Sequence, residues 1–432
     1  MRNVTLALLL SCLASCLALS AGASDWTQWF GPNHDGTSDE KIATTWPAGG
    51  PKVVWKVDMG EGLGTPVVAN GKVYILALTE PAKDAGKKTE RGGVESVVCL
   101  DAATGKQAWS SPVGPSIIHE HSGNDGPRST PAVDGGMVYA LSTNLILVCF
   151  DAKSGAKVWG HDCPSEFGGT VQLATSGISN WGCANSPVID GNLVFVHAGG
   201  KSQALLAFDK KTGKVAWKGQ DDELTHCSPT VATILGQRQI IFFTKSGLVS
   251  LVPESGKVLW RYAFPWKVST AISPVVGGDI IYCSAGYGVG GGACKITKEG
   301  DGQKATELWR NMQVISHWST PVYHDGYLYG LVGFKQFKFE PIKCIEMATG
   351  KTMWEQKGFG QGGTMLVDGN VMILGEEGQI VLCEASPKAY KELARVEALT
   401  YKCWNQPIVS GGRIYARSTK AVVCLDVSPT SK

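Results

Sequence analysis

The sequence predicts an all-β protein: an eight-bladed β-propeller of four-stranded antiparallel blades. Three observations support this fold class. A ten-residue cassette, first met at residues 100–109 (LDAATGKQAW), recurs along the chain. A strand pair that begins with Pro also recurs, giving a period of roughly 45 residues, the size of a propeller blade. The 54 glycines and the low charged fraction of 18% suit many short strands joined by tight turns.

The cassette is interpreted as the end of one strand, a tight turn and the start of the next strand. Close copies occupy residues 150–159 and 208–217, and looser copies occupy 251–260 and 345–354. Its Gly supplies the positive φ of a bulged hairpin turn, and its Asp and Thr or Ser side chains bond the backbone of the turn. The Trp that follows is expected to wedge against the neighbouring copy.

The second half of each repeat is a strand entered through Pro, a turn, and a β-branched and aromatic strand. It reads TPVVANGKVYILAL from residue 65, and further copies start at residues 129, 185, 227, 272, 319, 362 and 405. Pro at the first residue of a strand removes no ladder hydrogen bond, and NG, DG or GG marks a two-residue hairpin. The seventh copy lacks the Pro, and its cassette has decayed to ASPKAYKELARV. Residues 386–396 are the best helix candidate, with a simple turn as the alternative.

The eighth repeat ends near Asp426 without a fourth strand. The missing Trp strand is found at the other end of the chain, in residues 51–57 (PKVVWKV). An N-terminal strand that completes the last blade would close the ring and remove its exposed edges. The predicted domains are a signal peptide (1–23), a lead-in segment (24–50) and the propeller (51–428).

The N-terminus has the pattern of an export signal: Arg2, an apolar run over residues 4–19 and a small-residue cleavage site ending at Ala23. The alternative is a lipobox at residues 13–16, with a lipid anchor on Cys16. The run is shorter than the roughly 20 residues of a membrane-spanning helix, so no transmembrane segment is expected. Either route places the protein in the periplasm or cell envelope, or secretes it. Eleven cysteines then remain, and those that recur before the cassette turns are expected to be buried apolar side chains.

The repeated cassette is similar to that of the pyrroloquinoline-quinone (PQQ)-like β-propellers, a family that includes the quinoprotein alcohol dehydrogenases and the BamB-like envelope proteins. The resemblance covers residues 51–426. The head at residues 25–36 (DWTQWFGPNHDG) resembles the opening of exported members. The motif is specific for the fold and weak for function.

A ligand site is expected where the loops before each Pro converge on one rim of the central channel. These loops supply polar and aromatic side chains as ligand candidates: Arg128, Trp181, Asn185, His226, His317, Trp318, Trp404 and Asn405. Trp and Arg are enriched in recognition hot spots. The alternative is that the same side chains fill the channel and satisfy loop backbone. No catalytic residue or metal site follows from spacing, because residues 119–121 (HEH) would need a third ligand from elsewhere.

Three smaller motifs have structural interpretations. Residues 286–291 (GYGVGG) match a dinucleotide fingerprint by letters only, because no helix follows. Residues 334–339 (FKQFKF) are interpreted as a half-buried strand of the sixth repeat. Cys283 and Cys294 flank the glycine loop, and a disulfide between them is an alternative to two free thiols.

The sequence favours a non-catalytic binding or scaffold propeller of the bacterial envelope. Its partner would be an envelope protein, or a small-molecule or sugar ligand at the rim. The net charge of +2 gives no reason to expect nucleic acid. The resemblance implies an alternative, a dehydrogenase with PQQ stacked on a Trp beneath a disulfide of adjacent cysteines, beside calcium. No Cys-Cys dipeptide occurs, however, and the candidate carboxylates near the rim are few: Asp125, Asp221, Asp222 and Glu223.

Overall fold

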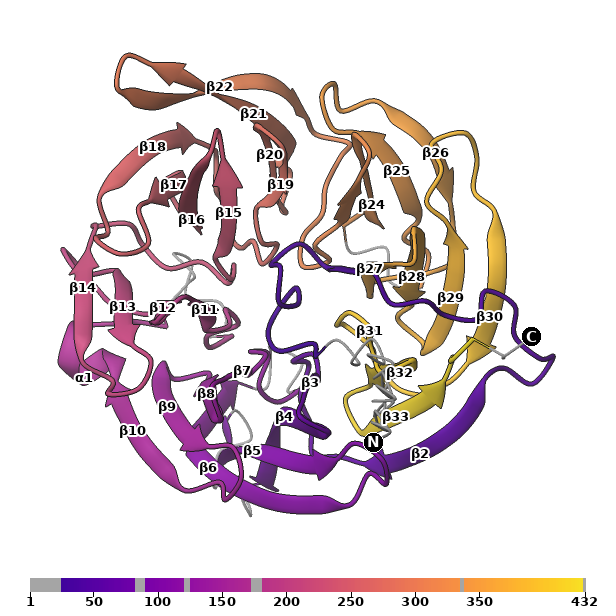
Figure 1. Ribbon diagram of the computed structural model, residues 1–432. Coiled ribbons are helices and arrows are strands. Elements are labelled where there is room, and N and C mark those ends of the chain that lie inside the picture. The colour runs from indigo at the N-terminus through magenta and orange to yellow at the C-terminus, as the bar shows by residue number, and fades with distance from the viewer. Residues whose placement is uncertain (1–24, 82–89, 120–124, 172–180, 335–337, 430–432) are drawn as a thin grey trace, which may run out of the picture.

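The computed structural model describes residues 25–81, 90–119, 125–171, 181–334 and 338–429. They form eight sheets arranged in a ring around a central axis (Figure 1). The predicted eight-bladed propeller of four-stranded antiparallel blades is therefore confirmed. The predicted signal peptide, Cys16, Glu120 and His121 lie outside the described residues. No helix within the described ranges is long and apolar enough to span a membrane.

Each blade consists of consecutive antiparallel strands, and the first strand of a blade lies innermost (Figure 1). Blade 1 holds β3 (Val67–Ala69), β4 (Lys72–Pro81), β5 (Glu90–Asp101) and β6 (Gln107–His119). Blade 2 holds β7 (Ala132–Asp134), β8 (Met137–Leu141), β9 (Ile146–Asp151) and β10 (Lys157–Asp162). Blade 3 holds β11 (Val188–Asp190), β12 (Leu193–His197), β13 (Leu205–Asp209) and β14 (Val215–Gly219). Blade 4 holds β15 (Thr230–Ile234), β16 (Gln237–Thr244), β17 (Gly247–Leu251) and β18 (Val258–Ala263).

The second half of the ring follows the same order. Blade 5 holds β19 (Val275–Gly277), β20 (Ile280–Ala285), β21 (Gly290–Glu299) and β22 (Gly302–Asn311). Blade 6 holds β23 (Val322–His324), β24 (Tyr327–Leu331), β25 (Ile342–Glu346) and β26 (Thr352–Gln356). Blade 7 holds β27 (Gly363–Val367), β28 (Asn370–Leu374), β29 (Gln379–Glu384) and β30 (Glu392–Glu397). Blade 8 holds β31 (Ile408–Ser410), β32 (Arg413–Arg417), β33 (Ala421–Asp426) and the N-terminal β2 (Lys52–Asp58).

Strand β2 completes blade 8, as the sequence predicts. It pairs antiparallel with β33, so that Trp55 lies opposite Cys424 and Lys52 opposite Asp426. The indigo start of the chain therefore lies beside its yellow end (Figure 1). Pairing of the two ends covers the edge that β33 would otherwise expose, and it closes the ring.

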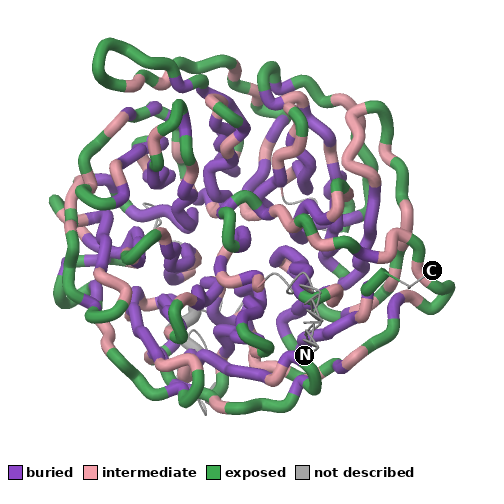
Figure 2. Tube along the Cα trace, viewed as in Figure 1, coloured by how far each residue is buried: buried purple, intermediate pink, exposed green. Residues whose placement is uncertain are grey.

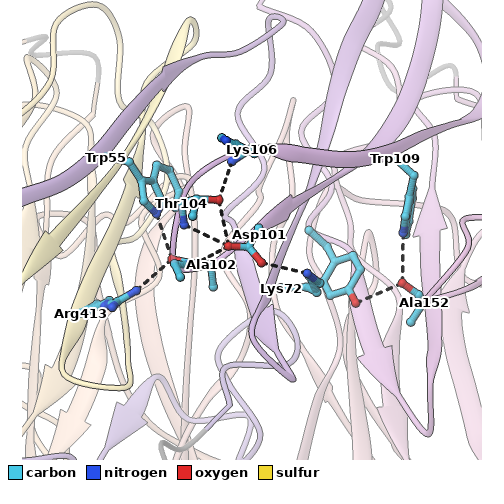
Figure 3. A network of polar contacts seen from close by, with 11 residues as sticks. Trp55, Lys72, Asp101, Ala102, Thr104, Lys106, Trp109, Ala152 and Arg413 are labelled. Atoms are coloured by element: carbon cyan, nitrogen blue, oxygen red, sulfur yellow. Dashed lines mark hydrogen bonds and ion pairs between the residues drawn. The ribbon is translucent and has the colours of Figure 1, made fainter.

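The cassette turn has the predicted hydrogen bonds. In blade 1, Asp101 Oδ1 accepts from the backbone N–H of Thr104 (3.1 Å) and from its hydroxyl (2.9 Å). Gly105 has φ 70°, and its N–H donates to the carbonyl of Asp101 (2.8 Å). Figure 3 shows this turn with Trp55 of blade 8 above it. The Trp55 indole donates to the carbonyl of Ala102 (2.9 Å), which also accepts from Arg413 (3.0 Å).

The same Trp contact joins most neighbouring blades, which confirms the predicted wedge. The indole N–H groups that donate to a carbonyl of the next blade are those of Trp109, Trp159, Trp217, Trp309 and Trp354. Trp260 differs, because it donates to Gln239 Oε1 within its own blade (2.8 Å). The reason lies in blade 5, where a long hairpin of β21 and β22 replaces the cassette that Trp260 would contact.

Two expectations for local structure are wrong. Residues 386–396 form no helix, because their second half is β30, which pairs with β29. The one helix of the described residues is α1 (Cys163–Phe167), a single turn after β10 that is capped by Asp162. Phe334, Lys338 and Phe339 form no half-buried strand and lie in the loop between β24 and β25, while residues 335–337 lie outside the described residues.

The cysteines that recur before the cassette turns are buried free thiols, as expected. Cys283 and Cys294 are also free, so the alternative of a disulfide between them is wrong. Cys294 lies opposite Ile281 in the ladder, and Cys283 lies opposite Gly292. Directly opposed positions are needed for two Cβ atoms to come within disulfide distance in neighbouring strands.

The lead-in segment, residues 25–50, runs across the centre of the ring (Figure 1). It supplies hydrogen-bond acceptors to innermost strands, which have no further strand beside them on the channel side. The N–H of Val68 donates to the carbonyl of Trp26, and the N–H of Val133 donates to the carbonyl of Thr27, both at 2.8 Å. Gln28 bonds both backbone groups of Ile189 in blade 3, accepting from its N–H (2.8 Å) and donating to its carbonyl (3.3 Å). No sequence pattern predicted this path.

Further along, the lead-in segment joins the sheet of blade 7. Its short strand β1 (Thr37–Ser38) pairs with β27 in parallel and makes this blade five-stranded. The Glu40 carboxylate then accepts the N–H groups of Gly411 (3.0 Å) and Gly412 (2.8 Å) in blade 8. The segment thus contacts blades on both sides of the channel and closes one end of it.

Candidate binding site at the channel mouth

The strand order defines two faces of the ring. We call the rim face the one at which each first strand begins, which also carries the loop between the second and third strands of a blade. The opposite face, the turn face, carries the short hairpins such as Asn70–Gly71 and the cassette turns. The lead-in segment lies toward the turn face, because Asp25 and Glu40 accept from the hairpins of blades 1 and 8.

A partial collar of hydroxyl groups lines the channel where the chain enters blades 1 to 6. The residue before the repeated Pro donates its N–H to the hydroxyl of its counterpart in the next blade. This occurs from Thr65 to Thr130 (3.0 Å), from Thr130 to Ser186 (2.9 Å), from Ser186 to Ser228 (2.8 Å) and from Ser273 to Thr320 (3.0 Å). The recurring Ser-Pro and Thr-Pro pairs are the sequence signal for this collar, although only the Pro of each pair had a predicted role.

The floor of the mouth includes Trp29 of the lead-in segment. Its indole N–H donates to the Ser273 hydroxyl (2.8 Å), which in turn donates to the carbonyl of Ser228 (3.0 Å). Trp29 therefore reaches the collar from the turn face. A ligand would enter the mouth from the rim face and meet this floor.

Three of the predicted rim residues form one aromatic cluster. The ring centroids of His317 and Trp318 are 4.7 Å apart, and those of Trp318 and Trp404 are also 4.7 Å apart with the planes inclined at 34°. The two tryptophans come from loops that enter blades 6 and 8. Tyr287 and Phe334, which the prediction did not include, pack against His317 with centroids at 5.4 and 5.2 Å.

Polar side chains fix the outer edge of this cluster. Lys402 Nζ lies 4.2 Å from the ring centroid of Trp404 and 2.8 Å from a carboxylate oxygen of Asp125, which comes from the loop that enters blade 2. The Trp404 indole donates to Glu376 Oε1 (2.9 Å). The other oxygen of Glu376 accepts from the backbone of Lys338 (2.6 Å). Lys402 and Glu376 had no distinguishing sequence signal, because their partners come from other blades.

A second group of predicted residues lies on the side of blades 2 to 4. Arg128 Nη1 donates to the carbonyl of Trp181 (2.9 Å), and the rings of Trp181 and His226 have centroids 6.1 Å apart. His226 also lies close enough to Arg128 and His317 for charge on them to affect its protonation. The second group therefore lies near His317 of the aromatic cluster.

The remaining two predicted residues lie deeper. Asn185 donates its side-chain N–H to the carbonyl of His197 (3.0 Å), and Asn405 donates to that of Arg417 (3.1 Å). Both asparagines are buried and tie an entry loop to the end of the second strand of the same blade. Contact of the eight predicted residues with a ligand stays a prediction.

The mouth carries little net charge. Burial, aided by the positive charge of Arg128 and by His317, lowers the pKa of His226 to about 3, so the imidazole is neutral. Burial lowers the pKa of Arg128, while Asp125 and Glu95 oppose that shift. Burial also raises the pKa of the Glu95 carboxyl, against hydrogen bonds from Thr143 and Ser116.

The described rim residues do not fit PQQ with calcium. Within the described ranges, no three His, Cys, Asp or Glu side chains are grouped so that they could hold a metal ion. The indole of Trp404 offers no open floor for a flat cofactor, because Lys402 lies over its ring and Trp318 packs against it.

A separate cavity of about 520 Å³ lies between blades 3 and 4, and none of the predicted rim residues lines it. It contains Asp221 and Asp222, two of the carboxylates considered from the sequence. Arg261 donates to both oxygens of Asp222 (3.1 and 3.0 Å), so this carboxylate serves as a structural ion pair rather than as a base.

Comparison with known proteins identifies similar chains. The family model described as "Outer membrane protein assembly factor BamB" matches residues 93–331. Tetrathionate hydrolase of Acidithiobacillus ferrooxidans is 24% identical over 54% of this chain and 44% of its own length. BamB of Shewanella oneidensis is 27% identical over 54% of this chain and 55% of its own. The chain thus spans about half the length of these curated relatives.

One solved structure has the same architecture along nearly its whole length. BamB from Moraxella catarrhalis superposes with a TM-score of 0.59 at 14% sequence identity, covering 88% of this chain and 99% of the other. At this identity the likeness bears on the fold alone.

Proposed function

The chain belongs to the family of the outer membrane protein assembly factor BamB, and on that premise we propose that it is a non-catalytic binding propeller that acts as a scaffold in the bacterial cell envelope. It would present its rim face to an envelope protein. The proposed mature chain consists of the lead-in segment and a propeller over residues 51–428, exported with a leader at residues 1–23 or anchored at Cys16.

Exposed apolar side chains on the rim face are the observation that supports protein binding most directly. Met312, Phe339 and Tyr401 are 65%, 69% and 59% exposed, and they are the most exposed of the large apolar side chains described. Met312 and Tyr401 belong to loops that enter blades 6 and 8, and Phe339 belongs to the loop between β24 and β25. All three therefore lie on the same face, on the side of blades 6 to 8.

Polar side chains border this apolar surface. Lys420 Nζ lies 4.9 Å from the ring centroid of Tyr401, and Lys338, next to Phe339, pairs with Glu377 (2.7 Å). A protein interface with an apolar centre and a charged rim has this composition. The proposed partner is accordingly a folded envelope protein with an apolar patch bordered by polar side chains.

Site-specific photocrosslinking in intact cells tests the proposal. A photoreactive amino acid would replace Met312, Phe339 or Tyr401, and Val158 on the outer strand β10, which is 45% exposed, would serve as the matched control. We expect a discrete adduct with an envelope protein from the rim positions and none from position 158. Absence of adducts at all three rim positions, or the same adducts at position 158, would contradict the proposal.

Calorimetric titration with PQQ, with and without calcium, addresses the enzymatic alternative. We expect no saturable heat. Calcium-dependent binding of about one PQQ per chain would replace the scaffold proposal with an oxidoreductase.

A further inference from the structure

We propose that the channel mouth is a second binding site, distinct from the apolar rim surface, which takes the end of a neutral oligosaccharide. This site goes beyond the scaffold function. It consists of the rings of Trp181 and Trp318, the polar atoms beside them and the floor formed by Trp29, while Trp404 supports Trp318.

The aromatic side chains suit a sugar ring. Trp181 and Trp318 are partly exposed in the mouth, and Trp404 packs against Trp318 at 4.7 Å and so holds it in place. The C–H groups on one face of a pyranose pack against an indole ring, because this contact removes apolar surface from water on both partners. Trp318 is rigidly supported, since His317 packs against its edge.

Buried polar atoms beside these rings lack protein partners. Among the described residues, Trp318 Nε1 and His226 Nδ1 make no hydrogen bond to the protein, and neither does the amide group of Gln406, which is 2% exposed and two residues after Trp404. A buried polar group without a partner costs about 1–3 kcal/mol. Three such groups in one mouth therefore point to a ligand or water that completes them.

These atoms match hydroxyl groups rather than ions. Trp318 Nε1 only donates, the Gln406 amide both donates and accepts, and a neutral imidazole does one or the other at Nδ1. A sugar hydroxyl donates and accepts at the same oxygen, so it satisfies each of them. A carboxylate or phosphate has no donor, and the basic groups that would attract it already face Asp125 and Glu95.

The closed channel determines which part of a glycan enters. The lead-in segment blocks the side of the turn face, and Trp29 bonds to the collar at Ser273 (2.8 Å). A polymer therefore does not thread through the ring, and the mouth receives a chain end from the rim face.

Isothermal titration of the full chain with neutral tetrasaccharides tests the site. The probes are cellotetraose, maltotetraose and tetra-N-acetylchitotetraose, with tetragalacturonate as the charged comparison. We expect saturable one-site binding of a neutral probe, a change in Trp fluorescence, and no binding of tetragalacturonate. Trp318→Phe keeps an aromatic ring but removes the N–H, so the affinity should fall about 5- to 20-fold with the melting temperature unchanged.

Trp217→Phe is the matched control, because the Trp217 indole donates to Pro253 on the outer side of the ring and should not affect sugar affinity. The proposal is overturned if no neutral probe binds at about 10 mM, if tetragalacturonate binds more tightly, or if Trp318→Phe binds like the wild type. Protein adducts at Met312 or Tyr401 without sugar binding would leave the scaffold function standing and refute this inference alone.

Discussion

Gly155 has no side chain because the Trp109 indole occupies the space that a Cβ would take. A Cβ placed there would come within 2.7 Å of the ring, and φ is 73°. Gly105, Gly213, Gly256 and Gly350 have the same relation to a tryptophan of the preceding blade. The cassette glycine therefore has two roles. It adopts the left-handed conformation of the turn, and its lack of a Cβ leaves room for the indole of the neighbouring blade.

Gly155→Ala should destabilise the protein more than Gly135→Ala. Gly135 also has positive φ (55°), but its Cβ would meet nothing within 4 Å. Both variants carry the strain of a left-handed Ala, about 1 kcal/mol, and only Gly155→Ala adds overpacking of about 1–3 kcal/mol. Urea unfolding measures the difference, and equal losses would show that the indole shifts freely.

His226 should make stability fall in mild acid. Its pKa is about 3 in the folded protein and near 6.5 when unfolded, so the unfolded state binds more protons between these values. The free energy of unfolding therefore falls as the pH drops below about 6.5, and this contribution reaches about 2 kcal/mol by pH 5.

His226→Gln, which cannot be protonated, should lose less stability than the wild type between pH 7 and pH 5. Denaturant titrations at the two pH values provide the comparison. A variant with the full wild-type loss would show that His226 is not held neutral. His34 and His197, whose pKa values burial lowers to about 4, contribute a loss of the same sign in both proteins.

At the scale of an element, the lead-in segment forms hydrogen bonds with the innermost strands of several blades. Innermost strands have a free edge toward the channel, and a buried N–H without a partner is costly. Trp26, Thr27 and Gln28 provide partners for three successive blades, and Trp26 is 1% exposed. The segment therefore contributes to the stability of the propeller, although it lies outside the repeats.

Gln28→Ala should lower the free energy of unfolding by about 2–4 kcal/mol, because both backbone groups of Ile189 lose their partner. Lys41→Ala is the control. Lys41 belongs to the same segment and pairs with Asp368 of blade 7, but its side chain is 77% exposed, so solvent screens the ion pair and its loss should change stability little. Chemical denaturation distinguishes the two. A loss at Gln28 no greater than that at Lys41 would mean that the segment is only loosely held.

At the scale of the whole molecule, closure joins blade 8 to blade 1 in two places. Trp55 of β2 bonds to the blade 1 cassette, and Arg417 crosses the junction. The Arg417 guanidinium is fully buried and donates to three carbonyls, those of Gly60 (2.9 Å), Gly64 (3.3 Å) and Leu76 (2.8 Å). Burial lowers its pKa to about 9.

Arg417→Met should lower the melting temperature while the protein still unfolds in one transition. The Met fills a similar volume but leaves three buried carbonyls without a donor, a loss of about 2–4 kcal/mol. Arg395→Met, which removes a partly exposed ion pair with Glu392, should cost under about 1 kcal/mol. In calorimetry, two separate transitions in Arg417→Met would show that the blades unfold independently once the junction is weakened.

Repetition and local chemistry determined the propeller from the sequence alone. The cassette recurs because each blade needs the same turn and the same Trp contact. The unpaired Trp strand at residues 51–57 fits only the last blade of a closed ring, because that blade lacks its fourth strand. These features are local or periodic, so they appear in the linear order of residues.

Tertiary structure decided the rest. Trp318 and Trp404 stand far apart in the sequence and meet because closure brings the loops of blades 6 and 8 to one mouth. The partners of Glu376, Lys402 and Gln28 likewise come from other blades, and no spacing rule encodes such contacts. The lead-in segment crosses the channel because the inner strands need hydrogen-bond partners there, a need that exists only after all the blades have assembled.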